Sequence, residues 1–227
     1  MRYGAKLAVD DLSLMVPTGT ITAILGPNGA GKTTTLETCE GYRRPQQGQV
    51  RVLGLDPWRE RDRLTPRIGV VLQGNGAWSG ARAEEMLRHL ASFYAHPQPV
   101  EALMDRLALH ECGRTPYRRL SGGQQQRLGI AMALIGRPEL VFVDEPTAGL
   151  DPHARRETWR LLEQLRTDGV TVVLTTHYLE EAEHLADLVH IVDHGRLVRS
   201  GTPAELTENG TRSLEDVFLD LTSPEHS

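Results

Sequence analysis

The chain has 227 residues, of which 39% are hydrophobic and 24% charged, and its formal net charge is −5. This composition excludes a disordered or fibrous protein, and the negative charge gives no global attraction to nucleic acid or to anionic lipid. The longest nearly continuous apolar run, from Leu128 to Gly136, is far shorter than the ~18 residues that indicate a membrane-spanning helix.

Short apolar runs alternate with helical patterns along the chain, which is typical of an α/β fold. The runs predicted as strands are Ile21–Leu25, Val50–Leu53, Ile68–Leu72, Leu140–Val143 and Val170–Thr175. A hairpin is predicted after them, with strands His190–Asp193 and Arg196–Arg199 joined across His194 and Gly195.

The stretch between the third and fourth of these strands has helical spacing only. Its apolar residues recur at Ala83, Met86, Leu87, Leu90 and Phe93, and again at Val100, Leu103 and Leu107. We therefore interpret residues 76–138 as a helical insertion in a single domain whose core comprises about 1–75 and 139–200. The tail, about 201–227, is polar apart from one helical pattern at Leu214, Val217, Phe218 and Leu221.

A glycine-rich loop follows the first predicted strand, precedes a helix, and matches the pattern G-x-x-x-x-G-K-[ST]. Successive N–H groups of such a loop can point at phosphate oxygens, and the following helix adds partial positive charge. Lys32 is expected to contact the β- and γ-phosphates, and the Thr33 hydroxyl to coordinate Mg²⁺. The nucleotide-binding residues predicted here are Gly26, Pro27, Asn28, Gly29, Ala30, Gly31, Lys32, Thr33 and Thr34.

Two adjacent carboxylates, Asp144 and Glu145, directly follow the buried strand Leu140–Val143. A strand of this kind delivers charge to the carboxyl edge of the sheet, where α/β folds bind their ligands. Asp144 is expected to hold Mg²⁺, directly or through a water. Glu145 is expected to accept a proton from the water that attacks the γ-phosphate, or to orient that water.

The segment Ser121, Gly122, Gly123 and Gln124 opens an apolar helix that extends to Ile135. Ser121 and Gln124 form a capping box, which is a sufficient reason for these two residues. Two glycines in a first turn carry a conformational cost, however, and they leave N–H groups bare for an anion. The residues alone do not decide between a helix cap and a second anion site.

Together, GPNGAGKTT, Gln73, LSGGQQQR, LVFVDEP, AGLD and His177 resemble the nucleotide-binding subunit of an ABC transporter over nearly the whole chain. The resemblance implies a P-loop NTPase with a RecA-like α/β core, a small antiparallel β part and a helical subdomain that carries the LSGGQ signature. It also implies ATP and Mg²⁺ as ligands and a dimer of cassettes that sandwiches the nucleotide.

The resemblance assigns roles that the residues alone do not. Gln73 is expected to touch Mg²⁺ and the attacking water, and His177 to contact the γ-phosphate and to position Glu145. Asp151 corresponds to a loop that crosses to the opposite subunit, and it also suits the N-cap of a helix that begins at Pro152.

Tyr3 stands where the family has an aromatic residue that stacks on adenine, but here the sequence departs from the family pattern. Family members have a β-strand before this tyrosine, whereas only Met1 and Arg2 precede it in this chain.

The sequence predicts an ATP-hydrolysing subunit that drives transport through a separately encoded membrane permease, because the chain itself contains no spanning segment. The blocks EGYRRPQQGQVRVLGLDP and SLEDVFLDLT are similar to those of drug- and antibiotic-export cassettes. A soluble ABC ATPase acting on ribosomes or nucleic acid is the alternative; those resemble tandem cassettes or carry a coiled-coil insert, neither of which is seen here. A regulatory module without hydrolysis is disfavoured by the intact Lys32, Asp144, Glu145 and His177.

The expected location is cytoplasmic, on the inner face of the cell membrane through the permease. The first residues, MRYGAKLAVDD, lack the apolar core of a signal peptide. Cys39 and Cys112 form no metal pattern and are expected to be reduced.

Overall fold

The computed structural model describes residues 1–4, 6–72 and 77–222. Within them, a six-stranded sheet has the order β4-β5-β6-β3-β7-β8, in which only β8 is antiparallel to its neighbour. Its strands are β3 (Ile21–Leu25), β4 (Ile68–Val71), β5 (Leu140–Asp144), β6 (Thr171–Thr176), β7 (Leu188–Asp193) and β8 (Arg196–Gly201). The strands predicted at these places, the hairpin included, are confirmed to within two residues at each end.

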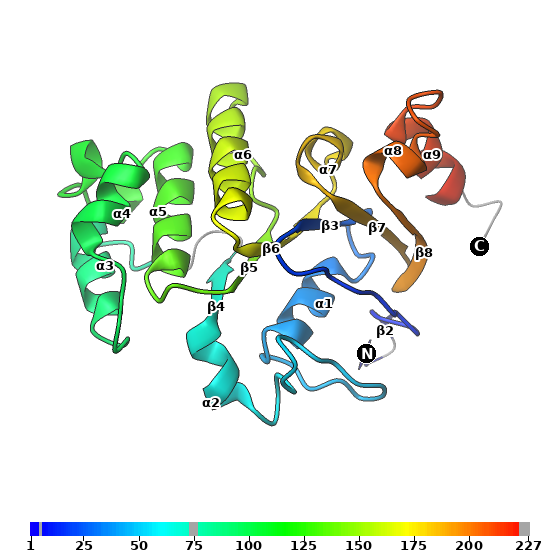
Figure 1. The fold of residues 1–227 in the computed structure, drawn as a ribbon, viewed down its shortest axis with the longest axis horizontal. Helices are drawn as coiled ribbons and strands as arrows, with labels where there is room; N and C mark the ends of the chain where they lie inside the picture. Colours follow the sequence, from blue (N-terminus) through cyan, green and yellow to red (C-terminus); the bar gives the residue numbers. More distant parts are fainter. Residues whose placement is uncertain (5, 73–76, 223–227) are drawn as a thin grey trace.

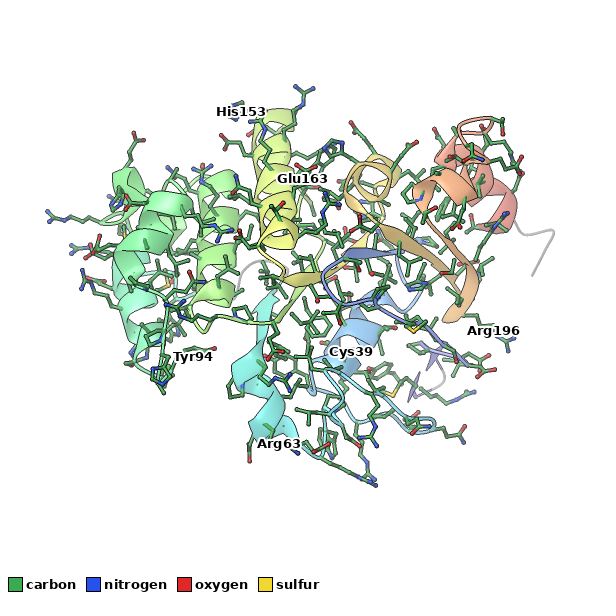
Figure 2. The ribbon with its side chains drawn as sticks, viewed as in Figure 1. Cys39, Arg63, Tyr94, His153, Glu163 and Arg196 are labelled. Atoms are coloured by element: carbon green, nitrogen blue, oxygen red, sulfur yellow. The ribbon has the colours of Figure 1, made fainter. Side chains whose placement is uncertain are left out.

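The sheet is covered on both faces, which explains why its strands read as continuous apolar runs. All five residues of β3 and all six of β6 are buried. Helices α6 (Pro152–Thr167) and α7 (Leu179–Leu185) lie on one face, and α1 (Lys32–Cys39) and the short α2 (Arg61–Leu64) on the other (Figure 1). The charged side chains of Arg63 and Arg196 lie at the periphery of the molecule (Figure 2).

The chain between β4 and β5 forms helices α3 (Ala83–Ala91), α4 (Val100–Arg106) and α5 (Gly122–Leu134), with 3₁₀ turns at His110–Cys112 and Tyr117–Arg119. These helices gather at one end of the sheet (Figure 1). Leu103 and Leu128 are fully buried in the same apolar cluster as Val141 of β5. The helical part and the sheet therefore share one core, and the position of α5 is fixed relative to the strands.

The C-terminal segment also joins this core. Helices α8 (Pro203–Leu206) and α9 (Leu214–Thr222) follow β8, and Leu206, Leu214 and Val217 are each 1% exposed. The helical pattern predicted at Leu214 to Leu221 is thus confirmed as α9. None of the helices in the described residues is both long and apolar enough to cross a membrane.

The prediction of a strand at Val50–Leu53 is wrong. Within the described residues, the backbone groups of Val52 and Leu55 bond to each other alone, across a turn in which Leu53 and Gly54 have φ of 49° and 79°. A strand needs a neighbouring strand to satisfy its backbone N–H and C=O groups, and none lies beside this segment in the described part of the chain. A groove of about 1400 Å³ lies there instead, between residues 9–16 and 45–53.

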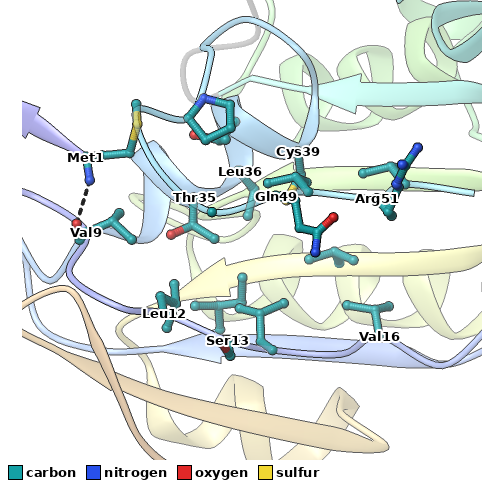
Figure 3. A pocket seen from close by; sticks show the side chains of 18 of the residues that line it. Met1, Val9, Leu12, Ser13, Val16, Thr35, Leu36, Cys39, Gln49 and Arg51 are labelled. Carbon is teal, nitrogen blue, oxygen red and sulfur yellow. Dashed lines mark hydrogen bonds between the residues drawn. The ribbon is translucent and has the colours of Figure 1, made fainter. Parts of the chain in front are cut away.

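The groove has an apolar floor and extended walls (Figure 3). Ile24, Leu36, Phe142 and Val173 line it and are buried. At its mouth the Met1 ammonium group donates to the Val9 carbonyl at 2.6 Å. The small antiparallel part beside it is confined to β1 (Arg2–Tyr3) and β2 (Lys6–Leu7).

Candidate functional site

The phosphate loop connects β3 to α1, as its sequence context predicts. Gly29 and Gly31 have φ of 87° and 100°, a region in which residues with a Cβ are strained. A Cβ on Gly31 would also lie 2.2 Å from the Ala8 carbonyl oxygen, so this position admits only glycine. The loop therefore places its N–H groups and the start of α1 together at the carboxyl edge of the sheet.

The Lys32 side chain is 6% exposed and folds back into the loop. Its ammonium group donates to the carbonyls of Gly26 at 2.7 Å and Pro27 at 3.2 Å, and lies 3.4 Å from Glu145 Oε1. The two carbonyls and Glu145 thus keep the buried Lys32 ammonium group beside the backbone N–H groups of the loop, which favour an anion. Phosphate oxygens can replace the two carbonyls as its partners without moving the helix that carries it.

Asp144 lies at the end of β5, beside Thr175 of β6. Thr33 Oγ1 donates to Asp144 Oδ2 at 3.0 Å, and the Thr175 hydroxyl donates to Asp144 Oδ1. A hydroxyl and a carboxylate oxygen are hard donors that suit Mg²⁺, which keeps its other positions for water and phosphate. Thr33 and Asp144 therefore fit a magnesium site. Gln73, the third residue predicted for it, lies outside the described residues.

Glu145 adopts a positive φ of 53°, which costs about 1–3 kcal/mol in a residue other than glycine. Its N–H group donates to Thr175 O at 3.1 Å and Thr175 Oγ1 at 3.2 Å, which secures this conformation. His177 Nδ1 lies 2.5 Å from Glu145 Oε2, while Lys32 lies beside Oε1. The carboxylate is thus held between two groups of the phosphate-binding edge.

One pocket of about 320 Å³ is lined by Lys32, Thr33, Glu145 and His177, and also by Asn28 and Thr34. Tyr3 lies at the same pocket, 39% exposed, with the Arg43 guanidinium 5.1 Å from its ring centroid. The structure therefore places Tyr3 at the same pocket as the phosphate loop, and its contact with the base stays a prediction.

The capping box at Ser121 is confirmed: Ser121 Oγ accepts from Gln124 N at 3.3 Å, and Gln124 Oε1 accepts from Ser121 N at 2.9 Å. The glycines have a packing role as well, because a Cβ on Gly123 would lie 3.0 Å from Ala154 of α6. Ser121 and Gly123 line a second pocket, of about 560 Å³, together with Arg127. Within one chain, the signature segment and the phosphate loop therefore line different pockets.

Asp151 lines this second pocket too, and caps α6 as predicted. Its Oδ1 accepts from His153 N at 2.9 Å and Ala154 N at 3.0 Å, and these bonds hold the pKa of the carboxyl below its usual range. His153 points away from the sheet at the outer end of α6 (Figure 2).

Sequence reasoning missed two groups at the site. Thr175, fully buried, contacts both Asp144 and Glu145, but it lies in a run that the sequence presents only as a strand. Glu40, at the end of α1, is 6% exposed and gives no motif signal. Burial, together with the charges of Asp144 and Glu37, raises the pKa of Glu40 to about 7.

The raised pKa of Glu40 predicts a pH-dependent stability. Because its folded pKa lies above its value of 4.5 in the unfolded chain, the folded state holds an extra proton, and stability falls as pH rises from 4.5 through about 7. Glu40→Gln should therefore raise the free energy of unfolding at pH 8 by roughly 2–3 kcal/mol and change it little at pH 5. Urea titrations in magnesium-free buffer measure both values.

Glu139→Gln is the matched control, since the Arg67 guanidinium lowers the pKa of Glu139. Its substitution should give no gain at pH 8. An equal gain for Glu40→Gln at both pH values would contradict the assignment of a buried, protonated Glu40.

Comparison with known proteins gives a consistent picture. The family model described as ABC transporter matches residues 9–148. A daunorubicin resistance ATP-binding protein, DrrA3 of Streptomyces coeruleorubidus, is 43% identical over 96% of this chain and 71% of its own length. A Nod factor export ATP-binding protein I of Sinorhizobium fredii is 41% identical over 91% of this chain and 62% of its own length. The chain thus spans only part of these relatives.

Two solved structures share the fold closely. The ATP-binding subunit of an ABC transporter has a TM-score of 0.85 at 25% identity, and the match covers 96% of this chain and 95% of that chain. A dimeric ATP-binding cassette in a post-hydrolysis state with ADP and Pi has a TM-score of 0.79 at 26% identity, over 89% and 94% of the two chains.

Proposed function

Because the chain belongs to the ABC transporter family and is an ABC-type ATPase domain, we propose that it hydrolyses ATP to drive export through a separate membrane subunit. The observation that carries the hydrolytic part is the convergence of Lys32 and His177 on the two oxygens of Glu145. A cation, a base and a histidine at one phosphate-binding edge suit attack of water on a γ-phosphate.

Each residue has a distinct role in this proposal. Lys32 exchanges the carbonyls of Gly26 and Pro27 for the β- and γ-phosphates, and Thr33 and Asp144 hold Mg²⁺. The metal neutralises charge on the phosphates when bound. Glu145 accepts the proton of the attacking water at one carboxylate oxygen, and His177 fixes that carboxylate and contacts the γ-phosphate. Gln73, from its position in the sequence, is assigned to the metal and the water.

The second pocket supports a site shared between two chains. Ser121, Gly122, Gly123 and Gln124 present the start of α5, and Asp151 the start of α6, on a surface separate from the phosphate loop. We assign these residues to the ATP bound by the opposite chain. The related cassette solved with ADP and Pi is dimeric, which agrees with this arrangement.

A groove of about 320 Å³ offers the surface for a membrane permease. It lies between β4 and the helical part and is lined by Leu72, Trp78, Met86, Leu90 and Tyr94. Leu72 and Trp78 are 45% and 56% exposed, so apolar surface is available to a partner. An apolar cytoplasmic segment of the permease is the proposed occupant, which would place the chain on the inner face of the membrane. The net charge of −5 argues against nucleic acid as the partner.

Efflux from cells tests the export function directly. The chain is co-expressed with a candidate membrane permease, with daunorubicin as the fluorescent probe because a relative is named for resistance to that drug. We expect energy-dependent efflux only when both proteins are present. Trp78→Glu should abolish efflux and leave the basal ATPase rate of the isolated chain unchanged.

Trp58→Glu is the matched control, since Trp58 is 45% exposed but does not line the groove. Efflux by Trp78→Glu at the wild-type rate would contradict the docking surface. Daunorubicin retention despite an active ATPase and a bound permease would contradict this drug class as cargo.

A further inference from the structure

A buried carboxyl that the proposed mechanism does not use lies in the first turn of α7. Glu181 is 0% exposed. Its Oε1 accepts from Thr147 Oγ1 at 2.8 Å and from Trp159 Nε1 at 3.0 Å, and both bonds are buried. Within the described residues, its Oε2 accepts no hydrogen bond. Moving a carboxyl from water into the protein interior costs free energy unless hydrogen bonds compensate for the water that it loses.

The two partners of Glu181 come from separate parts of the catalytic edge. Thr147, also 0% exposed, lies two residues after Glu145 in the turn where Ala148 N donates to Glu145 O at 3.2 Å. Trp159 belongs to α6, the helix that Asp151 caps. Glu181 itself lies four residues after His177, so one carboxyl oxygen joins three elements that carry proposed site residues.

The strained backbone at Glu145 explains why such a link matters. The N–H of Glu145 is secured by Thr175, but this fixes only the side of the turn next to β6. Beyond the carbonyl of Glu145, the chain leaves the sheet through the buried Pro146, and the Thr147 hydroxyl then donates a hydrogen bond to Glu181 in the core. The direction of the Glu145 carboxylate, 2.5 Å from His177, depends on both anchors.

We propose that Glu181 is a positioning residue that acts through Thr147 to hold the Glu145 carboxylate in place between His177 and Lys32. Through Trp159 it also ties α6 to the same turn. This inference rests on the proposed role of Glu145 as the base. Glu181 touches neither the phosphate loop nor the second pocket, so its effect is on the geometry of the base and not on ATP binding.

The interior shifts the pKa of Glu181 upward. Burial is the largest cause and the nearby charge of Glu145 acts in the same direction, whereas the neighbouring Thr176, Thr147 and Trp159 lower it. The Oε1 acceptor for Thr147 and Trp159 is present whether or not the carboxyl holds a proton. Glutamine keeps the same acceptor at the same place, so it should substitute for Glu181, while leucine keeps the volume and loses the acceptor.

Steady-state ATPase kinetics of the full chain test the proposal. We expect Glu181→Gln to retain kcat within about threefold, and Glu181→Leu to lower kcat at least ~10-fold with KM for ATP unchanged, because a base displaced by ~1 Å loses much of its effect. Thr147→Val, which keeps its volume, should lower kcat similarly. The double variant should lose no more than the worse single variant, since both act through one bond. Glu180→Leu, exposed on the same helix, is the control and should leave kcat unchanged.

Several outcomes would overturn the proposal. If Glu181→Leu lowers only the melting temperature and keeps kcat, the group is merely structural; if Glu181→Leu does not fold, wild-type kcat in Thr147→Val decides the same point. Equal losses in Glu181→Gln and Glu181→Leu, or a raised KM, also contradict it. Glu145→Gln in the same assay distinguishes failure of the base assignment from failure of the positioning role. If Glu145→Gln is fully active, the base assignment fails. If Glu145→Gln is inactive and Glu181→Leu is active, only the positioning role of Glu181 is refuted.

Discussion

Glu145→Gln is expected to leave ATP binding intact and to lower turnover at least ~100-fold. The amide cannot accept the proton that the carboxylate takes from water. Its oxygen can still lie beside Lys32 and its nitrogen beside His177, so the pocket keeps its shape. Phosphate release measures the turnover, and calorimetric titration with ATP measures the affinity.

The matched control is Glu139→Gln, which lies just before β5 at the opposite edge of the sheet and pairs with Arg67. It should keep wild-type turnover and affinity. Unchanged turnover in Glu145→Gln would show that another group is the base. Loss of ATP binding in a folded Glu145→Gln would show instead that the carboxylate is needed to hold Lys32 in its binding position.

The sequence predicts the sheet well because parallel strands buried on both faces leave an unmistakable apolar run. It fails at Val50–Leu53, where the local pattern is that of a strand but no second strand lies alongside in the described structure. Pairing is a property of the whole fold, and a single segment carries no signal for it.

The residues of the site likewise divide into those that the sequence predicts and those that it does not. Motifs that are contiguous in sequence, such as the phosphate loop and the Asp144–Glu145 pair, are predictable because each needs only a strand end or a helix start. The roles of Thr175 and Glu181 are not, since each is a single polar residue among neighbours that pack in the core. Their contacts arise from the register of β5 against β6 and from the packing of α7 on α6.

The last prediction concerns the shared site. Lys32 lines one pocket and Ser121 another, so a single chain does not offer both to the same nucleotide. Lys32→Ala should abolish activity, since it removes the cation at the β- and γ-phosphates. Ser121→Arg should also abolish it, because it places a large cationic side chain in the second pocket, which Ser121 lines. Ser121→Ala controls for the lost helix cap, which alone costs ~1 kcal/mol of stability.

Mixing the two inactive variants then distinguishes an ATP site built by two chains from an ATP site built within one chain. In a mixed dimer both substitutions fall in one site, and the other site is wild type in every residue. Random mixing makes about half of the dimers mixed, each with one intact site of two, so independent shared sites recover roughly a quarter of wild-type ATPase activity. If Lys32 and Ser121 served one site within the same chain, mixing would recover nothing.

Two shared sites that must act together would also give no recovery, and the Glu145→Gln variant resolves that case. Because it binds ATP without consuming it, a shared site makes its dimer stable only while ATP is present, through charge-assisted hydrogen bonds from both chains. Gel filtration should show a dimer with ATP and a monomer without it. Adding Ser121→Arg to Glu145→Gln should remove the dimer while leaving ATP bound at the phosphate loop, whereas a monomer at saturating ATP in Glu145→Gln itself would refute the shared site.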